Sequence, residues 1–177
     1  KILKVYVMKK ITLLLFLVCS MSMFATRYLV QKGGTGDAEW RALESGEILV
    51  DLTSEGKTLN AWLSDNFPTS FPSNSEVWLI HGTYVFNADH KMQANFVMRG
   101  GFLGAETSIE EREKGNNPWD FINETILDGN SSTNMLGCNG PRTVLLEGLT
   151  FTNGYIASNA GAITVRPGVV VQNSKFI

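Results

Sequence analysis

Short apolar runs separated by turn residues dominate the chain after residue 26. Residues 27–30, 77–80, 83–86 and 95–98 each contain three or four apolar side chains, and glycine, proline, asparagine or serine lies between them. Runs of this length, bounded by such residues, are typical of short buried strands. The pattern therefore predicts a protein built mainly from short strands.

One longer segment has the spacing of a helix instead. Within residues 57–67, the large apolar side chains Leu59, Trp62, Leu63 and Phe67 fall on one helical face. Pro68 ends this pattern because it cannot continue a helix. We predict that this amphipathic helix covers the exposed end of the strand stack, since such an end would otherwise recruit other strands.

The last part of the chain repeats itself at a fixed interval. Val144, Leu146 and Phe151 match Val169, Val171 and Phe176, each 25 residues further on, and turn residues separate short strands within each copy. A fixed repeat of this length indicates stacked passes of chain. The predicted fold is therefore an all-β right-handed parallel β-helix, a solenoid, with an N-terminal capping helix. A β-sandwich of hairpins is the rival, but it gives no reason for the repeat.

The first 25 residues have the pattern of a secretory signal peptide. Lys9 and Lys10 follow the first methionine that resembles a start, Met8, and precede the apolar run 11–18 and a stretch of small and polar residues. A membrane anchor is the alternative, but the apolar run is too short to span a bilayer. We therefore assign residues 1–25 to upstream residues plus the signal peptide, with cleavage after Ala25 or Ser22, and predict no transmembrane span afterwards.

Residues 26–177 are assigned to the cap and first coils of the solenoid, truncated at the C-terminus because the chain stops within a strand pattern. This part has 11 basic and 17 acidic residues, since four of the 15 basic residues precede residue 26. An acidic surface repels polyphosphate, which excludes nucleic acid as the expected partner.

Cys138 is the only cysteine after the signal peptide, so no internal disulfide can form in this part. The charges between residues 104 and 123 are expected on a solvated surface with a helical turn near 108–113.

Four segments in order resemble secreted proteins of the pectin-lyase-like superfamily found on Gram-negative surfaces. They are residues 32–37 with Trp40, residues 76–84, residues 100–108 with Arg112, and residues 146–154. Glu39 stands where that family usually has serine before the tryptophan, and the stretch between Trp40 and the helix has an insert. The resemblance implies export, a capped β-helix and a longer chain with a surface-sorting domain, but it implies no single activity.

Candidate catalytic chemistry is sparse. A lyase site would need carboxylates for Ca²⁺ and a base, for which Asp128 with Arg142 or Arg166 are the available residues. A hydrolase would need two opposed carboxylates, here Asp128 and Glu147. Asp128 lies in a turn signature, and His81 and His90 have no further ligand at metal-binding spacing. Catalytic and binding residues therefore stay unassigned, with no metal and no cofactor expected.

These observations favour a secreted or cell-surface module that is non-catalytic and adhesin-like or glycan-binding. Its partner would be a polysaccharide or a host or cell-surface glycan, with the aromatic side chains of Trp119, Tyr155 or Tyr84 as stacking surfaces. One alternative is a polysaccharide lyase or glycoside hydrolase with its active site in coils beyond Ile177. The other is a structural stalk.

Overall fold

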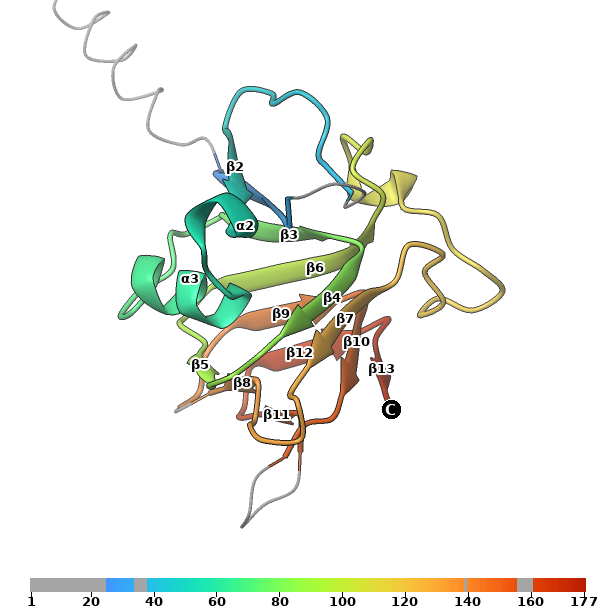
Figure 1. Ribbon diagram of the computed structural model, residues 1–177. Coiled ribbons are helices and arrows are strands. Elements are labelled where there is room, and N and C mark those ends of the chain that lie inside the picture. Colours follow the sequence, from blue (N-terminus) through green and yellow to red (C-terminus); the bar gives the residue numbers. More distant parts are fainter. Residues whose placement is uncertain (1–24, 34–37, 139, 156–160) are drawn as a thin grey trace, which may run out of the picture.

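The computed structural model describes residues 25–33, 38–138, 140–155 and 161–177 (Figure 1). The predicted signal peptide, apart from Ala25, lies outside these residues. No helix in the described ranges is long and apolar enough to cross a membrane.

Three parallel sheets form the body of the molecule. In spatial order, the six-stranded sheet contains β12 (Val169–Gln172), β9 (Val144–Glu147), β6 (Phe96–Phe102), β3 (Glu76–Ile80), β1 (Arg27–Gln31) and β2 (Glu47–Asp51). The four-stranded sheet contains β13 (Lys175–Phe176), β10 (Leu149–Thr152), β7 (Thr125–Asp128) and β4 (Gly82–Val85). The three-stranded sheet contains β11 (Ile163–Thr164), β8 (Leu136–Gly137) and β5 (His90–Lys91).

The 25-residue repeat corresponds to strand pairing. Val144 pairs with Val169 between β9 and β12, and Phe151 pairs with Phe176 between β10 and β13. The rings of Phe151 and Phe176 stack with centroids 4.8 Å apart. The predicted register is therefore confirmed, because residues one repeat apart are neighbours in adjacent parallel strands.

The predicted fold class is wrong. The sequence pattern favoured an all-β right-handed parallel β-helix with a capping helix, whereas the structure is of the α/β class, with parallel sheets and few helices. A solenoid stacks each strand beyond the previous one. Here β1 lies between β2 and β3, so the chain extends the sheet on one side of β1 and then returns to its other side. Strand β2 was not predicted from the sequence, because its residues fall in the segment interpreted as an insert.

A short helix follows β2 without a loop. Asp51 caps the N-terminus of helix α2 (Leu52–Glu55), and its carboxylate accepts hydrogen bonds from the backbone amides of Thr53 and Ser54 at 3.0 and 3.2 Å. This cap satisfies amide groups that the first turn of a helix leaves free. Gly56 ends α2 in the left-handed conformation, with a φ of 64°.

The predicted amphipathic helix is confirmed as α3 (Leu59–Asn66). Its buried side chains Leu59, Trp62 and Leu63 belong to the main core, and helix α3 contacts strand β5. Tyr28 on β1 meets the Trp62 ring edge-on at 5.8 Å. The helix thus joins the wall of the main core, which the inward side chains of all three sheets fill.

A second, smaller apolar cluster lies on the other face of the six-stranded sheet. It consists of buried Leu29, Trp40, Trp78, Ile80 and Phe102. Because side chains alternate between the two faces of a strand, Leu29 and Trp78 point to the outward face, whereas their neighbours Val30 and Leu79 point into the main core. The outward face of this sheet is therefore partly covered, and the candidate site lies on it.

His90 is expected to make the fold sensitive to acid. It is 2 % exposed, contacts Ser64 Oγ through Nδ1, and burial lowers its pKa from 6.5 to about 4. Between these values the unfolded chain binds a proton that the folded protein does not. The free energy of unfolding should therefore fall by about 3 kcal/mol as the pH falls from 6.5 to 4. Denaturant titration across this range measures the loss.

His90→Gln should remove most of this pH dependence, because glutamine does not titrate. His81→Gln is the matched control and should retain it. If the free energy of unfolding falls equally with pH in His90→Gln and in the parent protein, His90 is not the source of the acid sensitivity.

Candidate functional site

A row of charged side chains crosses the outward face of the six-stranded sheet. Arg27 on β1 pairs in register with Glu47 on β2 and with Glu76 on β3. Because the strands are parallel and in register, these side chains project from the same face in adjacent positions. Opposite charges therefore alternate across the three strands.

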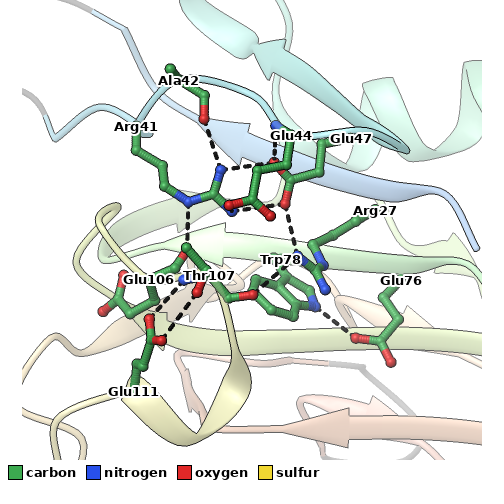
Figure 2. Close-up of polar contacts among 10 residues, drawn as sticks. All are labelled: Arg27, Arg41, Ala42, Glu44, Glu47, Glu76, Trp78, Glu106, Thr107 and Glu111. Carbon is green, nitrogen blue, oxygen red and sulfur yellow. Dashed lines mark hydrogen bonds and ion pairs between the residues drawn. The ribbon is translucent and has the colours of Figure 1, made fainter.

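Glu47 ends this row on the edge strand β2 and accepts several hydrogen bonds (Figure 2). Its carboxylate accepts hydrogen bonds from Arg27 Nη1 at 2.7 Å, from Arg41 Nη1 and Nη2 at 2.9 Å each, and from the backbone amide of Glu44 at 2.8 Å. Burial alone would raise the pKa of Glu47, but these hydrogen bonds outweigh it and lower the pKa to about 2. Glu47 is therefore ionised at any physiological pH.

Trp78 lies beneath Arg27. The Arg27 guanidinium carbon is 3.8 Å from the centroid of the indole, and the Phe102 ring stacks with the indole at 4.4 Å. The indole N–H donates to Glu76 Oε2 at 2.6 Å. Trp78 is thus fixed in orientation, and Figure 2 shows Arg27 between it and Glu47.

Residues 103–111, here called the wall segment, border this site. Arg27 Nη1 donates to the Thr107 carbonyl at 3.3 Å, and Arg41 Nε donates to the Glu106 carbonyl at 3.0 Å. Glu106 is buried and accepts from the backbone amides of Leu103 and Gly104 at 2.8 Å each. The expectation that the charges of this region are all solvated is therefore wrong. The predicted helical turn is confirmed as the 3₁₀ helix η1 (Ile109–Glu111).

A buried ionic network continues the row toward β9. Glu76 Oε2 accepts from Arg99 Nε at 3.0 Å, and Arg99 also forms an ion pair with Glu147. Glu147 Oε1 accepts from Arg112 Nη2 at 3.0 Å. Burial would raise the pKa of Glu147, but the charges of Arg112 and Arg99 lower it overall. Glu147 is therefore a structural carboxylate within an ion network.

Two adjacent hollows lie on this face, and together we call them the outer groove. The first, of about 400 Å³, is lined by Arg27, Glu47 and Trp78 together with residues 107–110 of the wall segment. The second, of about 520 Å³, includes Val97 and Leu145, which are register partners on β6 and β9. Asn74 and Glu76 line both hollows. The outer groove thus runs across β2, β1, β3, β6 and β9, a span of about 19 Å at the usual strand spacing.

Unoccupied polar groups line the outer groove. Asn74 and Asn95 are exposed, and neither side-chain amide has a hydrogen-bond partner within the described part of the chain. Both residues have a positive φ, 60° and 64°, which asparagine tolerates better than most residues. These amides can donate to and accept from a ligand, while half-buried Val97 and Leu145 offer apolar contact.

The predicted catalytic pairs are not brought together. Asp128 ends β7 in the four-stranded sheet and accepts from the Asn130 amide at 2.8 Å and from Asn153 Nδ2 at 3.0 Å, as a turn residue does. Glu147 belongs to the six-stranded sheet and is bound by arginines. Arg142 and Arg166 precede β9 and β12 in that same sheet, whereas Asp128 lies in another.

The remaining candidates are explained by packing. His90 is buried against α3, and Cys138 is buried with its thiol 3.0 Å from the Gly140 carbonyl oxygen. Among the described residues, no group of three histidine, cysteine, aspartate or glutamate side chains could hold a metal ion.

The predicted aromatic stacking surfaces differ in exposure. Tyr84 is only 2 % exposed, and its hydroxyl donates to the Ile80 carbonyl at 3.0 Å, so its assignment as a surface platform is wrong. Trp119 and Tyr155 are 49 % and 51 % exposed. Neither lines the outer groove.

Comparison with known proteins identified no similar protein. No family model matches the chain, and no curated sequence or solved structure is significantly similar to it.

Proposed function

We propose that this protein is an exported cell-surface module that binds a glycan without cleaving it, and that the outer groove is its binding site. The observation that carries the proposal is that the two hollows adjoin at Asn74 and Glu76. A groove that crosses five strands suits an extended chain better than a compact small molecule. The signal-peptide pattern and the resemblance to secreted pectin-lyase-like proteins support export.

The lining of the outer groove suits a ligand rich in hydroxyl groups. Ser45, Ser73 and Thr143 contribute hydroxyls, and the free amides of Asn74 and Asn95 both donate and accept. A glycan loses water on binding, and its hydroxyls need replacement partners because unpaired polar groups are costly. The alternating donors and acceptors of this lining supply such partners.

Charge favours a neutral glycan over an acidic one. Glu44, Glu76 and Glu110 line the same hollow as Arg27, so carboxylates outnumber guanidinium groups there. A uronate polymer would meet like charge at this surface, and the excess of acidic residues after residue 26 adds to the repulsion. A neutral polysaccharide or cell-surface glycan is therefore the proposed partner.

The ionisation of Glu47 supports a non-catalytic role. A general acid in glycoside cleavage needs a carboxyl group with a raised pKa. Two arginines instead lower the pKa of Glu47 to about 2. Glu47 therefore serves to position arginines.

A glycan array, followed by calorimetry on the strongest neutral ligand, tests this proposal. Asn74→Gly should weaken binding by roughly tenfold, because it removes a bidentate amide and glycine accepts the positive φ of this position. Asn130→Gly is the matched control, since Asn130 also has a positive φ of 51° but does not line the outer groove.

The control should bind like the parent protein. Absence of any glycan binding, or an equal loss in both variants, would contradict the proposal.

A further inference from the structure

We propose that Trp78 is an occluded stacking platform for a sugar ring, and that Arg27 is the side chain that the ligand displaces. This inference rests on the proposed function, because it assigns a ring-binding position within the outer groove. It differs from the stacking surfaces expected from the sequence, which were exposed aromatic residues.

Trp78 combines a position in the groove with almost complete burial. It lines the first hollow, yet only 2 % of it is exposed. Phe102 covers one face of the indole with an interplanar angle of 16°, and Glu76 holds the indole N–H. The Arg27 guanidinium carbon lies 3.8 Å from the indole centroid, and Figure 2 shows Arg27 between the indole and Glu47. Arg27 therefore stands between a preoriented aromatic face and the space of the groove.

The contacts of Arg27 are weak enough to exchange. Its side chain is 31 % exposed and makes one short hydrogen bond, to Glu47, and one longer bond, to the Thr107 carbonyl. Partly exposed ion pairs and cation–π contacts contribute little individually. Glu47 keeps both hydrogen bonds from Arg41 when Arg27 leaves, so no buried carboxylate loses its last partner.

The exposed indole would suit a neutral pyranose with equatorial hydroxyls. Such a ring presents C–H groups on its faces and hydroxyls around its edge. The C–H face can lie on the flat apolar indole, as apolar groups pack on aromatic rings. The edge hydroxyls can then donate to the carboxylates of Glu44 and Glu110 at the rim of the hollow.

The first experiment measures access to Trp78 without any ligand. In a Trp119→Phe background, which removes the exposed tryptophan, Arg27→Ala should increase acrylamide quenching of tryptophan fluorescence about twofold. The reason is that the three tryptophans then remaining among the described residues are at most 8 % exposed in the parent protein. Arg27→Lys retains a cation over the ring and should quench like the parent. Unchanged quenching in Arg27→Ala would overturn the occlusion.

The second experiment uses cellopentaose, a neutral oligosaccharide of equatorially substituted rings, as the probe. Calorimetry should show that Arg27→Ala binds it roughly tenfold more tightly than the parent, because displacement of the guanidinium is no longer needed. Arg27→Lys should bind within about twofold of the parent. Equal or weaker binding by Arg27→Ala would overturn the inference.

Different results would reject the stacking platform and the proposed function. If the parent binds neutral glycans on an array but Arg27→Ala gains no affinity, the platform is rejected and the proposed function stands. If neither protein binds any glycan, the proposed function is rejected as well.

Discussion

Glu147→Ala is expected to lower the free energy of unfolding by about 3–5 kcal/mol, the usual cost of leaving a buried charge without its partner. Glu147 pairs with Arg99 and Arg112, and the Arg112 side chain is only 2 % exposed. Burial already lowers the pKa of Arg112, while the carboxylate of Glu147 opposes that shift. Removing Glu147 leaves two guanidinium groups in place without this carboxylate. Urea denaturation followed by fluorescence measures the change.

Asp120→Ala is the control for this effect. Asp120 also forms an ion pair, with Lys175 at 3.0 Å, but its side chain is 44 % exposed. Water replaces the partner there, so the expected loss is about 1 kcal/mol. Similar losses of unfolding free energy in the two variants would mean that the ion pairs of Glu147 contribute no more than a solvent-exposed pair.

Gly148→Asn is expected to cost about 3–5 kcal/mol, through overpacking and a buried amide without partners. Gly148 has a φ of 69°, which asparagine can adopt. The obstacle is space: a Cβ atom at this position would lie 2.9 Å from the Gly100 carbonyl oxygen and 3.0 Å from Phe121. Thermal and denaturant unfolding of the variant measure the cost.

Asn173 provides a matched position, because it occupies the same corner one repeat later with a φ of 48°. Asn173→Gly loses the hydrogen bond of 3.3 Å to Glu147 and some backbone restriction, so we expect a loss of only about 1 kcal/mol. A mild effect of Gly148→Asn would contradict this cost and show that Phe121 and the Gly100 carbonyl move aside easily.

The sequence predicted strand register better than fold class. The repeat aligned Val144 with Val169 and Phe151 with Phe176, because residues that stack in parallel strands need similar shapes. It did not predict that β2 would lie beyond β1, since residues 47–51 have no counterpart at the repeat interval. The order of strands in this sheet depends on tertiary packing, which a periodic pattern does not encode.

The candidate site was harder to predict, because its residues are distant in the sequence. Glu47 meets Arg27 across 20 residues, and Arg27 meets Thr107 across 80. The burial of Tyr84, however, could have been predicted from the sequence. It alternates in phase with Phe86, so both side chains point into the core. Alternation of this kind also separates Trp78, on the outward face, from Val77 and Leu79.

Backbone chemical-shift mapping tests the central claim most directly. The isotopically labelled protein, beginning at Thr26, is titrated with the strongest neutral ligand from the array. The account predicts that the largest amide shifts occur at Asn74, Glu76, Val97 and Leu145, which line the outer groove. Shifts concentrated at Trp119 or Tyr155, with the groove amides unchanged, would contradict it.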